Sequence, residues 1–159
     1  DLLAWRFTEP TAADVRAIFD LRRAIEPAAA AMCARMASDE QIARLGAIFA
    51  EMEVTADDND RFAGPDLAFH QSLLRYTRNE LIASLASVVE MALLISFRMS
   101  DDIRAGQRHS LPSHRAVLER IQAHDEDGAR QAVTRLLDEA EADVHHVMQR
   151  GNEKEPFAT

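Results

Sequence analysis

Cysteine is nearly absent from this chain of 159 residues, which contains only Cys33. A single cysteine cannot form a disulfide within the chain, and it cannot supply the thiolate pairs that Cys-rich zinc modules need. We therefore interpret Cys33 as a small core residue rather than a nucleophile. The same scarcity favours a cytoplasmic location.

The chain also lacks an excess of basic residues. Its 18 Lys and Arg stand against 27 Asp and Glu, which gives a net charge of −9. Affinity for nucleic acid rests mainly on Lys and Arg that neutralise phosphates, so we expect no DNA binding by this chain itself. The first residue is Asp1 rather than an initiator Met, and we expect a partner domain upstream.

Two further patterns are missing. No apolar run approaches the roughly 20 residues that span a bilayer, and the start "DLLAWRFTEP" does not have the basic and apolar regions of a signal peptide. No stretch alternates with the period of two that half-buried strands would show, whereas apolar residues recur at intervals of three and four. We predict one all-α domain over residues 13–150, between a leader (1–12) and a disordered tail (151–159).

A charged side chain falls within the apolar stripe of the first predicted helix. This stripe includes Val15 and Ala29, and Arg22 lies seven residues from each. Residues seven apart lie two helical turns apart on one face, so Arg22 should point into the core. Pro27 interrupts the same helix and should kink it or split it in two.

Several helix starts are predicted from local signals. Ser38 and Gln41 form a capping box for the second helix. Pro65 and Pro112 are expected near the starts of the third and fifth helices, because proline is favoured in the first turn. The segment "ELIASLASVVEMALLISFRM" is apolar on nearly all sides and is the expected central, buried helix.

An acid and an imidazole share the apolar arc of the third predicted helix. In "DLAFH", Asp66 and His70 lie four residues apart and are flanked by apolar positions. On a solvated face they would form a weak ion pair, whereas burial without compensation would be costly. His114 similarly leads the apolar face of the fifth helix. A divalent metal bound by Asp66, His70 and His114 would compensate the burial, but satisfied core histidines remain the alternative on spacing alone.

Three segments together resemble the effector-binding domain of the FadR-type branch of GntR transcription regulators. They read "DLRRAIEPAAAAMCARMAS", "DLAFHQSLLRYTRNELIASL" and "SLPSHRAVLERIQAHDEDGARQAVTRLLDEAEADV", and the resemblance extends from about Asp14 to Val147. It implies an antiparallel bundle of six to seven helices that binds a small carboxylate effector at a divalent metal. It also implies an upstream winged helix-turn-helix domain that binds operator DNA as a dimer.

Carried over residue by residue, the resemblance assigns Asp66, His70 and His114 as metal ligands. The family's fourth ligand, a histidine on the last helix, falls where this chain has Leu136. We expect the remaining three ligands to hold the ion, with water or the effector at the freed position; loss of the metal is the alternative. Zinc is the first expectation, with nickel, manganese and iron as alternatives.

The segments "DLLAWRF" and "SLPSHRAVL" resemble the galactonate-operon sub-branch of that family. This closer resemblance implies a sugar acid, such as an aldonate, as the effector. Arg22, Arg98 and Asn79 are the expected effector-binding residues, although Asn79 is equally expected to cap a helix.

We therefore predict a sensor domain without enzymatic activity, in a homodimer. Its effector would favour one arrangement of the helices and so change the spacing of the upstream DNA-binding domains. One rival is a metal-dependent hydrolase, for which Glu26 is the available base, although Glu26 is more simply the partner of Arg22. The other rival is a purely structural dimerisation bundle that binds no metal.

Overall fold

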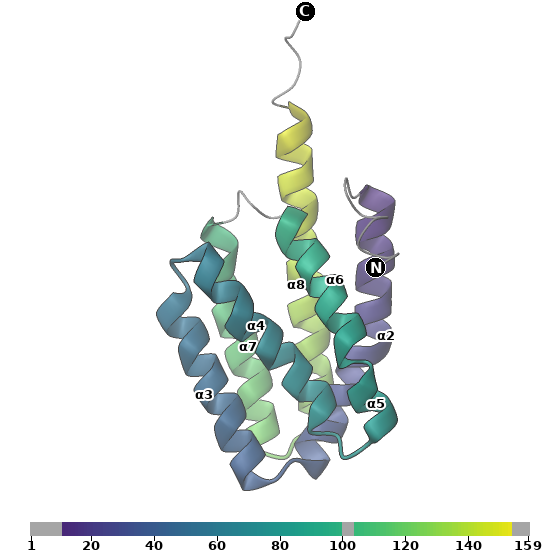
Figure 1. Cartoon of the computed structure of the whole chain (residues 1–159), viewed down its shortest axis with the longest axis vertical. Coiled ribbons are helices and arrows are strands. Elements are labelled where there is room, and N and C mark those ends of the chain that lie inside the picture. The colour runs from purple at the N-terminus through teal and green to yellow at the C-terminus, as the bar shows by residue number, and fades with distance from the viewer. Residues whose placement is uncertain (1–10, 100–103, 154–159) are drawn as a thin grey trace, which may run out of the picture.

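The computed structural model describes residues 11–99 and 104–153, and this part of the chain forms seven helices and no strand (Figure 1). The predicted all-α bundle is confirmed. The helices are α2 (Ala12–Met36), α3 (Asp39–Thr55), α4 (Asn59–Arg75), α5 (Glu80–Ser84), α6 (Ala86–Met99), α7 (Arg104–Gln122) and α8 (Glu126–Glu153). Most of the predicted leader and the predicted tail from residue 154 lie outside the described residues, and α8 continues to Glu153.

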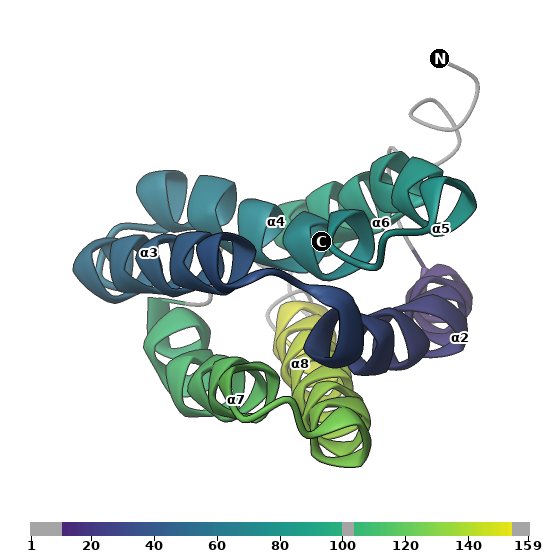
Figure 2. The same ribbon diagram turned by 90° about the horizontal axis from the view of Figure 1, so that it is seen from below.

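The helices pack in two layers. Figure 2 shows α3, α4 and α6 in one row and α7, α8 and α2 in the other. The most extensive pairing joins α2 to α8, the first and last helices of the described chain. The largest side chains buried in the core are Phe19, Phe69, Leu45, Met52, Leu73, Leu74, Ile121 and Leu137.

The predicted start of the second helix is confirmed. The Ser38 hydroxyl accepts from the Gln41 backbone N–H at 3.3 Å, and the Gln41 side chain accepts from the Ser38 N–H at 3.0 Å. This reciprocal capping box satisfies two backbone donors that the first turn leaves without a helical partner.

Three prolines lie inside helices, and this makes two predicted helix starts wrong. Pro27 does not split α2. Helix α4 begins at Asn59 instead of Pro65, because the Asp58 side chain caps it by accepting from the Arg61 N–H. Helix α7 begins at Arg104 instead of near Pro112. Each internal proline removes one helical hydrogen bond, so packing elsewhere must offset that loss.

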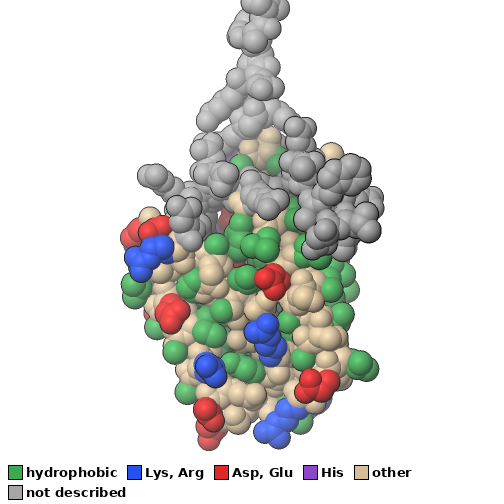
Figure 3. Space-filling model, in the orientation of Figure 1, with side chains coloured by type: hydrophobic (Ala, Val, Ile, Leu, Met, Phe, Trp, Pro, Cys, Tyr) green, Lys and Arg blue, Asp and Glu red, His purple; other side chains and the backbone are tan. Residues whose placement is uncertain are grey.

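The segment expected to be central is divided and lies at the edge of the bundle. Leu85 separates α5 from α6, and within these helices Leu81 is 80% exposed and Leu94 is 45% exposed. Contrary to the expectation that no apolar run approaches membrane-spanning length, the stretch Glu80–Phe97 is long and apolar enough to cross a membrane. The core helix of a soluble protein passes the same test, so this stretch is weak evidence for a membrane span. The expectation of one central, buried helix is wrong. Figure 3 shows hydrophobic side chains spread between charged ones on this face of the molecule.

Candidate metal centre

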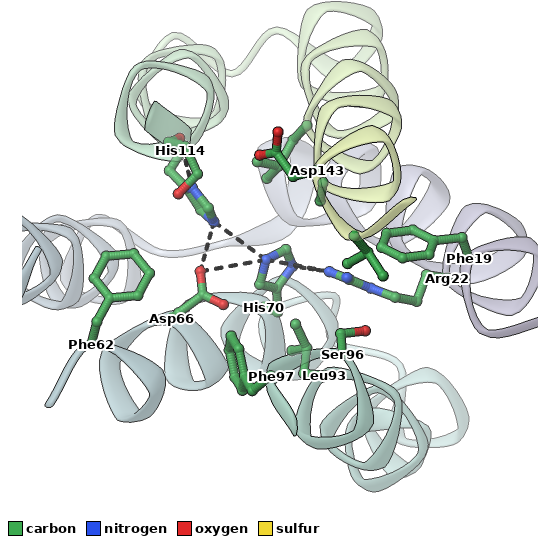
Figure 4. A pocket seen from close by; sticks show the side chains of 14 residues that line it. Phe19, Arg22, Phe62, Asp66, His70, Leu93, Ser96, Phe97, His114 and Asp143 are labelled. Atoms are coloured by element: carbon green, nitrogen blue, oxygen red, sulfur yellow. Dashed lines mark hydrogen bonds and ion pairs between the residues drawn. The ribbon is translucent and has the colours of Figure 1, made fainter. Parts of the chain in front are cut away.

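Four polar side chains from three helices converge in one cavity between the layers (Figure 4). Arg22 comes from α2, Asp66 and His70 from α4, and His114 from α7. They are only 2%, 5%, 2% and 3% exposed, respectively. The predicted inward orientation is therefore confirmed for all four.

The three expected metal ligands bring their ligand atoms together. His114 Nε2 lies 2.9 Å from Asp66 Oδ1 and 3.3 Å from His70 Nε2, and His70 Nε2 lies 3.9 Å from Asp66 Oδ1. One ligand atom from each residue lies within 4.8 Å of the others. A carboxylate and two imidazoles so arranged form a donor set suited to a divalent transition metal.

A second contact orients each imidazole. His70 Nδ1 lies 2.5 Å from Glu26 Oε2, and His114 Nδ1 lies 2.9 Å from the Ser110 carbonyl oxygen. Both partners only accept, so both Nδ1 atoms donate, and the Nε2 atom of each neutral ring carries a lone pair. The two lone pairs and the Asp66 carboxylate then face one another, and the guanidinium of Arg22 reaches only the His70 side of the group, at 3.5 Å from His70 Nε2. A bound cation would satisfy all three, and such contacts on Nδ1 are typical of histidines that ligate metals.

Glu26 supports the cluster from a fully buried position. Its Oε1 accepts from Arg22 Nε at 2.6 Å, so the predicted Arg22 partnership is confirmed. Burial alone would raise the pKa of Glu26, but Arg22 and His70 outweigh it and lower the pKa to about 2. Glu26 is therefore a carboxylate that holds two donors. The sequence predicted the contact of Glu26 with Arg22, which is four residues away on the same helix. It did not predict the contact with His70, which lies on another helix.

Asp66 is also held as a carboxylate. Burial acts to raise its pKa, whereas the neighbouring His114, His70 and Arg22 together lower it. An ionised Asp66 is the form that ligates a cation.

The cavity beside this cluster has a volume of about 110 Å³ and is lined by α2, α4, α6, α7 and α8. One buried water needs roughly 10–15 Å³ on this scale, so the cavity has room for a small ligand. We call the part of the cavity that is lined by buried residues its inner part, and this part contains the cluster. Its outer part contains the partly buried residues Phe97, Ser110, Ala140 and Asp143.

Leu136 lines the inner part of the cavity from α8 and is 2% exposed. The position expected for a fourth ligand therefore does face the cavity, but its side chain offers no ligand atom. Asp143, seven residues further along the same helix, reaches the cavity as well. We did not predict Asp143, although two helical turns from Leu136 would have been the signal.

Of the other two expected effector-binding residues, the structure describes the side chain of Asn79 alone. The Asn79 side chain accepts from the backbone N–H groups of Leu81 and Ile82 at 3.0 and 3.3 Å, and so caps α5. Asn79 is not among the residues that line the cavity. Arg98 lies on α6, but its side chain is outside the described part of the structure.

Comparison with known proteins identifies relatives of this fold. A sequence profile of the FCD domain matches residues 17–139. The galactonate operon transcriptional repressor of Escherichia coli K12 is 25% identical over 126 residues, which are 77% of this chain and 54% of the repressor. The uncharacterised HTH-type transcriptional regulator YieP of the same organism is 28% identical over 140 residues, which are 86% of this chain and 60% of YieP. The chain thus spans little more than half the length of these relatives.

Two solved structures are similar in fold. The GntR protein of Streptococcus agalactiae has a TM-score of 0.69 at 23% identity, over 80% of this chain and 58% of that one. McbR/YncC of E. coli has a TM-score of 0.76 at 13% identity, over 84% of this chain and 65% of that one. At these identities the likeness establishes the helical fold alone.

Proposed function

The chain belongs to the FCD domain family, and from this premise we propose that it is the effector-binding and dimerisation domain of a cytoplasmic GntR-type transcription regulator. Its effector is a small sugar acid, such as an aldonate, bound beside a divalent metal ion, with zinc as the first candidate. Operator DNA binds to a winged-helix domain upstream of this one. The relatives that match are transcription regulators, which supports a sensor rather than an enzyme.

The observation that carries the proposal is the convergence of three possible metal ligands, one carboxylate and two imidazoles, beside a cavity. Asp66, His70 and His114 would hold the ion, because their ligand atoms face one another and each imidazole is oriented from behind. The ion would supply an open coordination position for a carboxylate or hydroxyl oxygen. Leu136 leaves that position free of a fourth protein ligand and supplies an apolar wall beside it.

Arg22 would bind the effector carboxylate. Its guanidinium lines the cavity, and Glu26 uses the Nε–H at 2.6 Å. A guanidinium has five N–H donors, so others remain available to a carboxylate. Glu26 fixes the position of the group, which reduces the ordering that effector binding would otherwise require.

The same arrangement disfavours the hydrolase alternative. A general base must accept a proton near neutral pH, whereas Glu26 has a pKa of about 2 and already accepts from Arg22 and His70. Its carboxylate is therefore committed to positioning these two side chains.

A route from the effector to the rest of the domain passes along α2. Arg22 faces the cavity, and the next residue, Arg23, donates to Asp138 on α8 at 2.9 Å and also to Glu141. An effector bound by Arg22 thus acts on α2, which these ion pairs join to α8. It can favour one arrangement of α2 and α8 only by its differential affinity for the two arrangements.

A thermal-melting screen tests the proposal. The chain is loaded with Zn²⁺ and melted with aldonates, uronates and simple hydroxy acids, each with and without a strong chelator. At about 100 times its Kd, a ligand adds about 2.7 kcal/mol of stability, which raises the Tm by roughly 5–10 °C for a domain of this size. We expect such a shift with one sugar acid, and its loss with chelator.

Two variants sharpen this screen. His70→Ala removes a proposed ligand and should abolish the acid-dependent shift, whereas His146→Ala removes an exposed histidine on α8 and should keep it. No shift with any acid in the wild type, or an undiminished shift in His70→Ala, would refute the metal-dependent sensor.

A further inference from the structure

The outer wall of the cavity carries a carboxylate that the metal cluster does not use. Asp143 lines the cavity from α8, and Figure 4 shows it on the α8 side, apart from Asp66 and His70. No hydrogen bond or ion pair joins its carboxylate to any residue that the structure describes. Burial and the nearby Glu139 raise the pKa of Asp143 more than His109 and His146 lower it. Its side chain is thus partly desolvated and available to a ligand.

The inner part of the cavity has the charge to accept one carboxylate. With neutral imidazoles, the buried charged groups are Arg22, Glu26 and Asp66. The two carboxylates offset Arg22 and one of the two charges of a divalent ion, which leaves one positive charge. Because uncompensated charge is costly in a buried site, a single carboxylate completes the inner part.

The depth of these groups sets the orientation of the ligand. Arg22, Asp66, His70 and His114 are all at most 5% exposed, whereas Asp143 lies in the partly buried outer part. A ligand whose carboxylate reaches Arg22 and the metal therefore directs its other end toward the outer wall. That end meets Asp143, a side chain that accepts hydrogen bonds and, when ionised, donates none.

We infer that Asp143 makes the cavity selective for monocarboxylic acids that carry hydrogen-bond donors, hydroxyl or ammonium groups, at the end away from the carboxylate. A second carboxylate at that end would face the like charge of Asp143, so the matching dicarboxylic acid is rejected. This inference rests on the proposed function and specifies the class of acid that the site accepts.

Calorimetric titration of the zinc-loaded chain with matched acids tests the inference. Galactonate and gluconate are each compared with the dicarboxylic acid of the same carbon skeleton, galactarate and glucarate. A third arm, 6-aminohexanoate, separates ammonium from hydroxyl donors at the same end. We expect the better of the donor-bearing monoacids to bind at least about tenfold more tightly than the diacids, a difference of about 1.4 kcal/mol.

Asp143→Asn assigns this preference to the residue. The amide keeps the shape and one acceptor but removes the charge, so the preference should fall below about threefold, mainly through tighter binding of the diacid. Asp127→Asn is the matched control. Asp127 is exposed in the first turn of α8 and does not line the cavity. Its replacement makes the same chemical change on the same helix and should leave the preference unchanged.

The outcomes separate this inference from the proposed function. If wild type binds a monoacid but the preference persists in Asp143→Asn, or if wild type binds the diacid equally well, the selective role of Asp143 is refuted and the sensor function stands. If no acid binds the zinc-loaded wild type, the proposed function fails and the inference fails with it.

Discussion

Replacing Glu26 with glutamine should weaken metal binding, although Glu26 is not one of the proposed ligands. Its two oxygens accept from different donors, Oε1 from Arg22 Nε at 2.6 Å and Oε2 from His70 Nδ1 at 2.5 Å. A side-chain amide has one acceptor oxygen, so glutamine can satisfy only one of the two donors. The charged guanidinium is the stronger donor, which leaves the NH₂ group facing His70.

This substitution should change the protonation of Nε2, the proposed ligand atom of His70. Its Nδ1 would then accept, and the ring would carry its proton on Nε2, which faces His114 Nε2 at 3.3 Å. A metal ion would have to displace that proton before it could bind. Loss of such an orienting contact typically lowers metal affinity by roughly 10- to 100-fold, or about 1.4–2.7 kcal/mol. The variant also leaves Arg22 buried without its partner charge, which lowers the free energy of unfolding by about 3 kcal/mol.

Competition for Zn²⁺ against a chelating fluorophore measures this loss. The titration is done well below the melting temperature of the variant, with circular dichroism to verify the folded state. Glu119→Gln is the control, because Glu119 is exposed on α7, the helix that carries His114. Zinc affinity of Glu26→Gln within threefold of wild type would refute the role of Glu26 in setting the tautomer of His70.

Three further changes test other parts of the structure. Leu136→His places an imidazole on the cavity wall, so zinc affinity should rise at least about tenfold while the metal-free form loses about 2 kcal/mol; melting with and without chelator measures both. Burial raises the pKa of Cys33 to about 12, so at pH 8 a thiol reagent should label the folded chain at least about a thousandfold more slowly than the unfolded chain. Asn79→Ala removes the cap of α5 and should lower the unfolding free energy by about 1 kcal/mol without changing zinc or acid affinity.

Helical periodicity was sufficient to predict that four polar side chains point inward. Arg22, Asp66, His70 and His114 were predicted from their places in apolar stripes, and all four are buried. This succeeded because the face of a helix depends on residue spacing within that helix, which the sequence contains directly.

Helix boundaries were harder to predict, since they depend on contacts made elsewhere. Pro65 and Pro112 resemble helix starts locally, yet α4 and α7 begin several residues before them. In α4, the Asp58 cap and the buried Phe62 stabilise the first turns, and they offset the hydrogen bond that Pro65 removes. The edge position of α6 was missed for a related reason, because apolar composition does not reveal how many neighbours a helix has.

The site itself was predicted only as far as single helices allow. Glu26 was expected to pair with Arg22, but its contact with His70 joins residues 44 apart in the chain. Whether Asp143 meets the same cavity depends on how α8 packs against the other layer. Both relations depend on tertiary packing. Spacing can place Asp143 on the same face of α8 as Leu136, but it cannot show which other helices that face meets.

The pairing of α2 with α8 has a consequence for synthesis of the protein. Arg23 and Asp138, which join these helices, are separated by 115 residues. At about 5–20 residues per second, translation needs roughly 6 to 23 s to pass from one to the other. Throughout that interval the nascent α2 lacks its most extensive packing partner, and the cavity lacks the wall that carries Leu136 and Asp143. The cavity therefore becomes complete only when α8 has been made.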